Sequence, residues 1–532
     1  MDTRQLRAAL LVAILVLSWG PVFAQAPEGK PVPGGTVVFA IGNDAAMVNP
    51  NLTTNSPDSI FGCLVYQSLI YPRMDGKVDP LLAKSWTTAP DGMTYTFQLV
   101  DAKWQDGKPL TSADVKFSLL EVSSKHSAIF ARVGAVIETI ETPDPRTVVI
   151  RLKKPYGPFL YALGCHGGAA ILPAHVFQGT DAFKNEASLT KPMGTGPFIM
   201  SELARGSHVI MTKNPNYWDS GKPYIDKIIF KIIPTPAARV LSLQSGEVHY
   251  ISYDFVSFND YKVIQANPKL YLHEILFPPP DDLMFFNVRR GPTANRLVRQ
   301  ALAMATDREY LLKTIWFGLG NVGVSSFDSR ITWVYNPKVD YRKMYPFDPA
   351  RAKALLDEAG FKPGADGTRF TLEFVVSSAL QPYVAVSQAV KSMWGDVGIN
   401  VKIEALDASA TAQRVFKEGK FDVNMQGYTT YGDPALGIVR QFVSSTIEQP
   451  FGNASGYTNT EVDQLSEQGQ NAINPAERAK YYFQVQEIIA RDLPNLLVHE
   501  RQSYDAASKR LRGAWTGHVG YGDWANAWLA PE

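Results

Sequence analysis

The side chains that could perform catalysis lie scattered along the chain, without the spacings that common enzymes use. The eight histidines form neither an H-E-x-x-H motif nor another metal-ligand pattern, so we predict no metal and no cofactor. Residues 166–168 read HGG, as in esterase oxyanion loops, but without a G-x-S-x-G elbow they predict a backbone turn. No phosphate-binding G-x-x-x-x-G-K-[ST] occurs, and no G-x-G-x-x-G follows a predicted strand.

These absences favour a binding protein over an enzyme. Paired carboxylates could still form a glycosidase, because spacing in the sequence does not exclude such a pair. A secreted hydrolase of peptides or glycans is therefore the alternative to a binding function.

Cys63 and Cys165 are the two cysteines of the chain. In an oxidising compartment they could form a disulfide bond. Two buried free thiols are equally consistent with the sequence, because it does not give the distance between the two Cα atoms. No C-x-x-C pattern indicates a redox or zinc site.

The first 24 residues have the pattern of a secretory signal peptide. Arg4 and Arg7 precede an apolar run from Ala8 to Trp19, and Val22-Phe23-Ala24 offers the small residues of a cleavage site. The run is shorter than the roughly 20 residues that span a bilayer, although a retained N-terminal anchor is the alternative. No cysteine lies near the cleavage point, so we expect a soluble periplasmic protein and not a lipoprotein.

The charge and composition of the chain limit the classes of binding partner. After removal of residues 1–24 the chain keeps 50 basic and 50 acidic residues, whereas nucleic acid or an anionic membrane as main partner calls for a basic excess. Aromatic residues make up 11% of the chain. Tyr and Trp suit a pocket with an apolar body and polar edges, but any large mixed domain contains many of them.

Strand and helix patterns alternate along the chain, which predicts an α/β or mixed α+β fold. Residues 94–99 alternate polar and apolar side chains as a half-buried strand does. Asp348-Pro349 to Gly360 predicts a helix with a cap at each end, and Asn474-Pro475 begins a second one. Pro278-Pro279-Pro280 predicts either a stiff connection between lobes or an ordinary loop.

Several stretches, in order, resemble the family 5 solute-binding proteins of ABC importers, the dipeptide, oligopeptide and nickel group. The resemblance covers roughly residues 35 to 510. It is carried by residues 81–86 (LLAKSW), 91–99 (DGMTYTFQL), 104–115 (WQDGKPLTSADV), 194–198 (GTGPF), 214–218 (NPNYW), 243–248 (LQSGEV), 286–287 (FN), 298–302 (VRQAL), 306–308 (TDR), 348–360, 397–399 (VGI) and 433–434 (DP).

The resemblance implies a periplasmic binding protein fold of type II, with two lobes, three domains, a hinge and a ligand cleft between the lobes. It further implies a small-molecule or peptide ligand, a membrane permease as partner, no nucleic acid, and a monomer. The implied division is 30–65 (domain I, first part), 66–204 (domain II), 205–282 (domain I, second part), 283–505 (domain III) and 506–532 (domain I, C-terminal part).

The resemblance also indicates ligand residues. In peptide-binding relatives an Asp a few residues before the acidic-Pro pair holds the ligand's ammonium group, and the matching position here is Thr430. A Thr hydroxyl does not neutralise a buried charge, so peptide-like solutes and other ligands, such as opines, sugars or modified peptides, both stay open. The predicted ligand residues are Tyr428, Thr430, Tyr431, Asp433, Asn55, Tyr504 and Arg414, with a structural loop around Asp433 and a solvated Arg414 as the alternatives.

Overall fold

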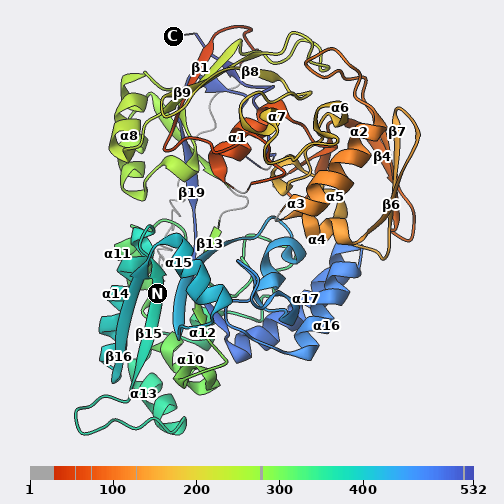
Figure 1. Cartoon of the computed structure of the whole chain (residues 1–532). Coiled ribbons are helices and arrows are strands. Elements are labelled where there is room, and N and C mark those ends of the chain that lie inside the picture. The colour runs from red at the N-terminus through yellow and green to blue at the C-terminus, as the bar shows by residue number, and fades with distance from the viewer. Residues whose placement is uncertain are drawn as a thin grey trace, which may run out of the picture.

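The computed structural model describes residues 29–531, apart from residues 54, 74, 128, 276–279, 519 and 521. The predicted signal peptide lies outside the described residues, as do Pro278 and Pro279 of the proline run. The described chain forms two lobes, one above the other in Figure 1.

A seven-stranded sheet forms the base of the first lobe. Strand β1 pairs in parallel with its two neighbours, and the remaining pairs of the sheet are antiparallel. In spatial order the strands are β12 (Leu270–Ile275), β19 (Ser503–Ser508), β11 (Tyr250–Ile251), β1 (Thr36–Ile41), β10 (Lys227–Ile232), β9 (His208–Lys213) and β8 (Phe198–Ala204). Helices α1 (Ser56–Val65), α8 (Pro236–Ser245) and α9 (Tyr261–Gln265) accompany this sheet.

A four-stranded antiparallel sheet completes the first lobe, at the upper right of Figure 1. It has its own apolar core, centred on side chains such as Phe97, Trp104 and Phe159. Its strands are β4 (Ala83–Thr88), β5 (Thr94–Leu99), β7 (Thr147–Leu152) and β6 (Ile137–Asp144). The same part of the chain contains the strand pair β2 (Ile70–Pro72) and β3 (Val78–Pro80), and helices α2 (Ser112–Phe117), α3 (Ser124–His126), α4 (Phe130–Ala135), α5 (Phe159–Ala162), α6 (Ala174–Phe177) and α7 (Glu186–Leu189).

A six-stranded mixed sheet forms the second lobe. Its strands are β14 (Asn321–Val322), β18 (Asn495–Glu500), β13 (Pro280–Phe286), β17 (Val423–Thr429), β15 (Phe370–Ser377) and β16 (Ile399–Leu406). Its helices are α10 (Arg296–Met304), α11 (Arg308–Ile315), α12 (Tyr341–Met344), α13 (Pro349–Glu358), α14 (Gln381–Gly395), α15 (Ala408–Ala412), α16 (Thr460–Asn471) and α17 (Pro475–Asp492). The short strands β20 (Leu511–Arg512) and β21 (Trp528–Leu529) follow β19 and pair with each other in the first lobe.

The helix predictions are confirmed by their caps. The Asp348 side chain accepts a hydrogen bond from the backbone N–H of Arg351 at the start of α13. Gly360 has a φ of 89°, a conformation that suits glycine just past a helix end. Helix α17 begins at Pro475, where the side chain of Asn474 accepts from the backbone of Ala476.

The chain crosses between the lobes at two neighbouring places. Strand β12 pairs with β19 in the first sheet, and β13 pairs with β18 in the second. The chain therefore passes between the lobes from Ile275 to Pro280, across residues outside the described part, and again from β18 through Arg501 and Gln502 to β19. Two adjacent strand crossings of this kind form a natural hinge. The limits of the three domains stay a prediction. Strand β8 lies in the segment 66–204 expected for domain II, but it pairs with β9 in the seven-stranded sheet.

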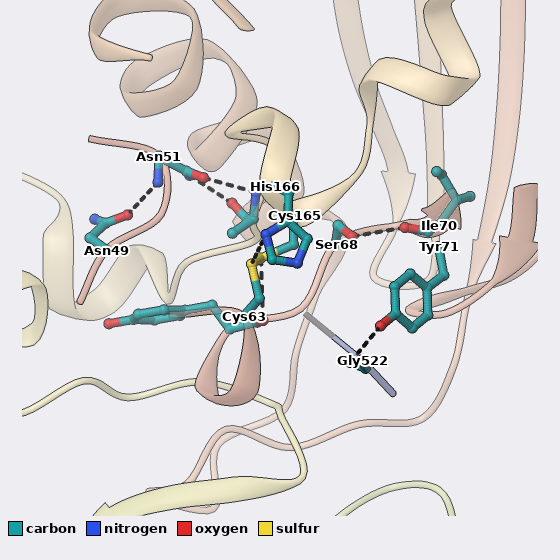
Figure 2. The surroundings of a disulfide bond; sticks show 11 residues. Asn49, Asn51, Cys63, Ser68, Ile70, Tyr71, Cys165, His166 and Gly522 are labelled. Carbon is teal, nitrogen blue, oxygen red and sulfur yellow. Dashed lines mark hydrogen bonds between the residues drawn. A yellow bond between two sulfur atoms is a disulfide. The ribbon is translucent and has the colours of Figure 1, made fainter. Parts of the chain in front are cut away.

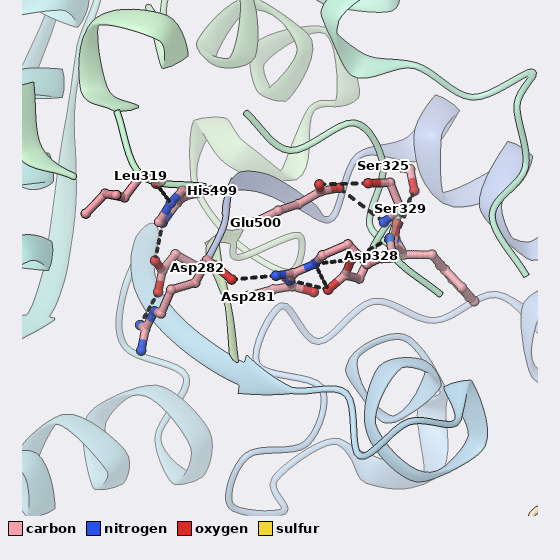
Figure 3. A network of polar contacts seen from close by, with 11 residues as sticks. Asp281, Asp282, Leu319, Ser325, Asp328, Ser329, His499 and Glu500 are labelled. Atoms are coloured by element: carbon pink, nitrogen blue, oxygen red, sulfur yellow. Dashed lines mark hydrogen bonds and ion pairs between the residues drawn. The ribbon is translucent and has the colours of Figure 1, made fainter. Parts of the chain in front are cut away.

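A buried network of charges lies where these crossings enter the second lobe (Figure 3). The Asp282 carboxylate accepts hydrogen bonds from His499 Nδ1 at 2.8 Å, Arg501 at 2.5 Å and the Tyr383 hydroxyl at 2.7 Å. Despite burial, the charge of Arg501 and the hydrogen bond from His499 hold the pKa of Asp282 well below its usual range. These contacts tie β13 to β18 and to α14 at the base of the hinge.

Candidate functional site

A cavity of about 450 Å³ lies between the two lobes. The first lobe supplies most of its wall, from α1, the segments around β2, β3 and α5, residues 217–222, and His518, Gly520 and residues 522–526. From the second lobe the described lining is Thr429, Tyr431 and Leu436. A volume of this size suits a small molecule or a short peptide.

Aromatic side chains held by hydrogen bonds form one wall. Gln67 donates to the Tyr217 hydroxyl at 2.9 Å and accepts from the indole N–H of Trp218 at 2.9 Å. Tyr66 donates to the carbonyl of Ala187 at 2.6 Å. Because these contacts fix the rings, the wall presents rigid apolar faces with polar edges.

A cluster of charged side chains lies at another part of the wall. Asp79 accepts hydrogen bonds from Arg73 at 3.1 Å and from His518 Nε2 at 2.8 Å. The other ring nitrogen of His518 lies 3.8 Å from a carboxylate oxygen of Asp523, and the ring of Tyr71 stacks on His518 at 4.0 Å. Burial alone would raise the pKa of Asp79, but the hydrogen bonds from Arg73 and His518 lower it, so this carboxyl stays charged.

A disulfide bond between Cys63 and Cys165 forms a third part of the wall (Figure 2). It decides between the two states that the sequence left open, and it links α1 to the turn at residues 165–167. The Nδ1 atom of His166 lies 3.7 Å from the Sγ of Cys63, and burial lowers the pKa of His166 to about 4. His166 is therefore uncharged near neutral pH.

Gly520 lets the C-terminal segment approach this wall. Its φ is 117°, and a Cβ atom at this position would lie 2.2 Å from the Nε2 atom of His166. A side chain would therefore force Gly520 and His166 apart at this wall.

Tyr431 reaches the cavity from the second lobe. It has a φ of 49°, a left-handed conformation that is uncommon for residues other than glycine. The guanidinium of Arg440 lies 5.5 Å from the Tyr431 ring and 5.1 Å from the Tyr428 ring. This cation–π sandwich holds the Tyr431 loop against the body of the second lobe.

Asp433 faces Arg478 and not the cavity. The two side chains form a bidentate pair with both N–O distances at 2.6 Å, and both are buried. Asp433 also accepts from the backbone N–H of Ala435 at the start of the π-helical turn Pro434–Ile438. Its carboxylate is thus occupied by structural contacts.

The other predicted ligand residues lie outside the cavity lining. Tyr428 is buried and donates a hydrogen bond to the carbonyl of Gly452. Thr430 is also buried, and its carbonyl oxygen is so close to Gly437 that a Cβ atom on Gly437 would lie 2.2 Å from it. Asn55, just before α1, donates a hydrogen bond to Asp58 in the first turn of that helix. Tyr504 packs on Tyr261 beside the hinge. Arg414 pairs with Glu404 at 2.9 Å on the second lobe.

Sequence reasoning missed Asp79, Tyr71, Trp218 and Asp523, which line the cavity. Trp218 lies in one of the motifs that carry the family resemblance, and this was the available signal. Tyr71 and Asp79 pair across the local β2–β3 hairpin, whereas Asp523 joins them in the cavity lining only through the folding of the C-terminal segment.

Two lobes joined by paired crossings, with a cavity between them, define a solute-binding protein of the periplasmic type. The family model described as "Bacterial extracellular solute-binding proteins, family 5 Middle" matches residues 77–449, and the chain belongs to this family. The predicted two-lobed binding-protein fold of type II is thereby confirmed.

Known proteins resemble the chain over nearly its whole length. A Brucella ovis protein named as an ABC transporter peptide-binding protein is 28% identical, over 97% of this chain and 96% of that protein. The glutathione-binding protein GsiB of Escherichia coli K12 is 27% identical, over 90% and 91%. The periplasmic binding protein DppA of Helicobacter pylori, solved with the peptide STSA, matches with a TM-score of 0.78 and 25% identity, over 94% and 99%.

Within the part of the chain that the structure describes, no helix has the length and apolar character needed to cross a membrane.

Proposed function

We propose that the chain is the substrate-binding component of an ABC importer, and that it captures a peptide-like or other small polar solute and delivers it to a membrane permease. The observation that carries this proposal is the cavity between two lobes that are joined at a hinge. Relatives named for peptide and glutathione binding support a peptide-like ligand.

The geometry explains how capture would work. Enclosure between the lobes removes water from the ligand, so a few polar groups and the aromatic wall suffice to hold it. Closure also creates a surface made from both lobes, which a transporter can distinguish from the open form. Of the predicted ligand residues, Tyr431 is our candidate for direct contact, because it lines the cavity. Tyr428 and Asp433 would act by supporting its loop.

The remaining parts of the proposal concern the setting of this activity. We propose that the protein is not an enzyme, that it acts as a monomer without nucleic acid, and that residues 1–24 direct it to the periplasm as a soluble protein. The family's extracellular character supports this setting.

The test is thermal unfolding of the secreted chain against di- to pentapeptides, opines and sugars. A ligand that binds only the folded state adds about 2.7 kcal/mol of stability at a hundredfold excess over its Kd. We expect a shift with at least one solute and recovery of that solute unchanged, in one-to-one stoichiometry. Turnover of the bound solute would instead support the secreted hydrolase.

A further inference from the structure

The described lining of the cavity carries an excess of negative charge. Its acidic members come from four separate segments, and His166, one of its two histidines, is uncharged near neutral pH because of its lowered pKa. Within the described lining, Lys222 is the one lysine and no arginine occurs. The acidic side chains are Asp79, Asp219, Asp254 and Asp523.

Lys222 is already paired inside this lining. Its ammonium lies 3.0 Å from a carboxylate oxygen of Asp219, three residues earlier in the chain. A ligand carboxylate would therefore have to compete with Asp219 for the one lysine. An anionic group enclosed without a free partner of opposite charge is costly to bury.

The cluster around His518 offers negative charge, which suits a cationic group of a ligand. Asp79 has 40% of its side chain exposed, and its contacts leave it ionised. The buried carboxylate of Asp523 lies on the other side of the same imidazole and accepts from the Thr516 hydroxyl at 3.2 Å. Arg73 is shared between Asp79 at 3.1 Å and Asp75 at 3.3 Å, so its single positive charge does not by itself offset both Asp79 and Asp523.

The second lobe does not compensate for this charge. Its described lining residues, Thr429, Tyr431 and Leu436, are uncharged. Arg440 is not among the described lining residues, and its guanidinium lies against the rings of Tyr428 and Tyr431. Closure over a ligand therefore adds apolar and hydroxyl surface but no charged side chain from the described lining. The charged side chains of the described lining therefore favour a cation at the Asp79–Asp523 cluster.

We propose that the cavity selects solutes with a net positive charge, namely amines or peptides whose terminal carboxylate is absent or masked. The ammonium group lies at the Asp79–Asp523 cluster, and the apolar part of the ligand lies on the Tyr and Trp wall, where ring faces also attract cations. This inference rests on the proposed binding function and adds the charge class of the ligand.

A matched ligand series tests this selection by calorimetric titration of the secreted chain. Dipeptides with apolar side chains are compared in three forms: with a C-terminal amide (cation), unmodified (zwitterion) and N-acetylated (anion). We expect the amides to bind about tenfold more tightly than the unmodified peptides, which corresponds to one pair of charges in a partly enclosed site. The N-acetylated acids should show no saturable binding.

Two variants locate the effect. Asp79→Asn should weaken binding of the amides by about tenfold. It should also reduce the difference in Kd between the amide and the unmodified peptide. Asp75→Asn is the matched control, because Asp75 pairs with the same Arg73 and has 43% of its side chain exposed, but lies outside the cavity lining. Unfolding curves of both variants without ligand confirm that they fold.

The outcomes separate the two proposals. Equal or tighter binding of the unmodified or N-acetylated peptides would overturn the charge selection and leave the binding function in place. An equal loss of affinity in Asp75→Asn and Asp79→Asn would overturn the assignment to the cavity cluster. Absence of binding by all three forms and by the wider solute panel would overturn the proposed function, and the inference with it.

Discussion

Asp433 shows how a carboxylate in a ligand-facing loop can be withdrawn from ligand chemistry. The acidic-Pro pair is prominent in the sequence, and Tyr431, two residues earlier, does line the cavity. The Asp433 side chain, however, pairs with buried Arg478, whose pKa its charge raises despite burial. At the scale of single residues, the acidic-Pro motif indicates correctly which loop approaches the ligand. The direction in which the Asp433 side chain points depends instead on Arg478, which lies 45 residues later in the chain.

Asp433→Asn should therefore destabilise the second lobe and not merely change ligand affinity. The substitution leaves the buried guanidinium of Arg478 without its counter-charge, which costs about 3–5 kcal/mol. Denaturant unfolding of the ligand-free protein measures this loss.

Asp407→Asn is the matched control, because exposed Asp407 also caps a helical segment of the same lobe, and Asn caps about equally well. Equal stability of the two variants would contradict the structural role of the Asp433–Arg478 pair.

Glu500 gives stability a pH dependence of a definite sign. Burial and the nearby charge of Asp328 raise the pKa of Glu500 from 4.5 to about 6. Because the folded state binds this proton more tightly, Glu500 contributes stability below pH 4.5 and loses that contribution as the pH rises through about 6. The whole change is worth about 2 kcal/mol.

Glu500→Gln should remove this dependence while keeping a polar contact to Ser329. The free energy of unfolding of the variant should rise relative to the native protein by about 2 kcal/mol between pH 4.5 and 7.5. Urea titrations across this range measure the difference, with exposed Glu358→Gln as control. Parallel curves for the native protein and Glu500→Gln would contradict the raised pKa.

At the scale of elements, the disulfide holds two parts of the cavity wall together. Helix α1 belongs to the core of the seven-stranded sheet, and the turn at residues 165–167 follows α5 of the smaller sheet. The bond between Cys63 and Cys165 closes a loop with a sequence separation of 102 residues. A covalent link of this length restricts the unfolded chain and, in the native state, fixes the spacing of the wall.

Replacement of both cysteines by alanine should lower the free energy of unfolding by about 2–5 kcal/mol. Ligand affinity should fall as well, because His166 loses its sulfur contact at the cavity. Chemical reduction of the native protein should reproduce the loss of stability. An unchanged unfolding midpoint in the double variant would show that packing alone holds α1 to the turn.

The elements were more predictable from the sequence than the site. Helices α13 and α17 have their caps and prolines within a few residues, so local signals determine them. The cavity instead joins Asp79, Trp218, Tyr431 and Asp523, which only tertiary pairing brings together. The family resemblance indicated the cleft and the loop of Tyr431. It did not indicate the acidic cluster, because Asp79 and His518 meet through contacts 439 residues apart.

At the scale of the whole molecule, the two lobes touch beside the cavity as well as at the hinge. The backbone N–H of Gly157 in the first lobe donates to the carbonyl of Gln470 in the second at 2.8 Å. Lys154 pairs with Glu467 at 2.6 Å on the same side. A Cβ at position 157 would lie 2.5 Å from the carbonyl oxygen of Ala472, so only glycine permits this approach.

Gly157→Ala should therefore hinder closure without unfolding either lobe. We expect about tenfold weaker ligand binding, the equivalent of about 1.4 kcal/mol, with unchanged stability of the ligand-free protein. Titration calorimetry measures the affinity, and X-ray scattering measures compaction on binding. Gly395→Ala is the control, because a Cβ there meets nothing within 4 Å. Full compaction and affinity in Gly157→Ala would contradict a role of this contact in closure.

The unequal shares of the lobes in the cavity wall have a kinetic consequence. Because the first lobe supplies nearly all of the described lining, a solute can make most of its contacts there before the second lobe arrives. Association rates should then depend on residues such as Trp218, whereas Tyr431, which meets the ligand only after closure, should govern how long the ligand stays. Stopped-flow measurements on Trp218→Ala and Tyr431→Ala would resolve this order, in which the first lobe recruits the solute and the second retains it.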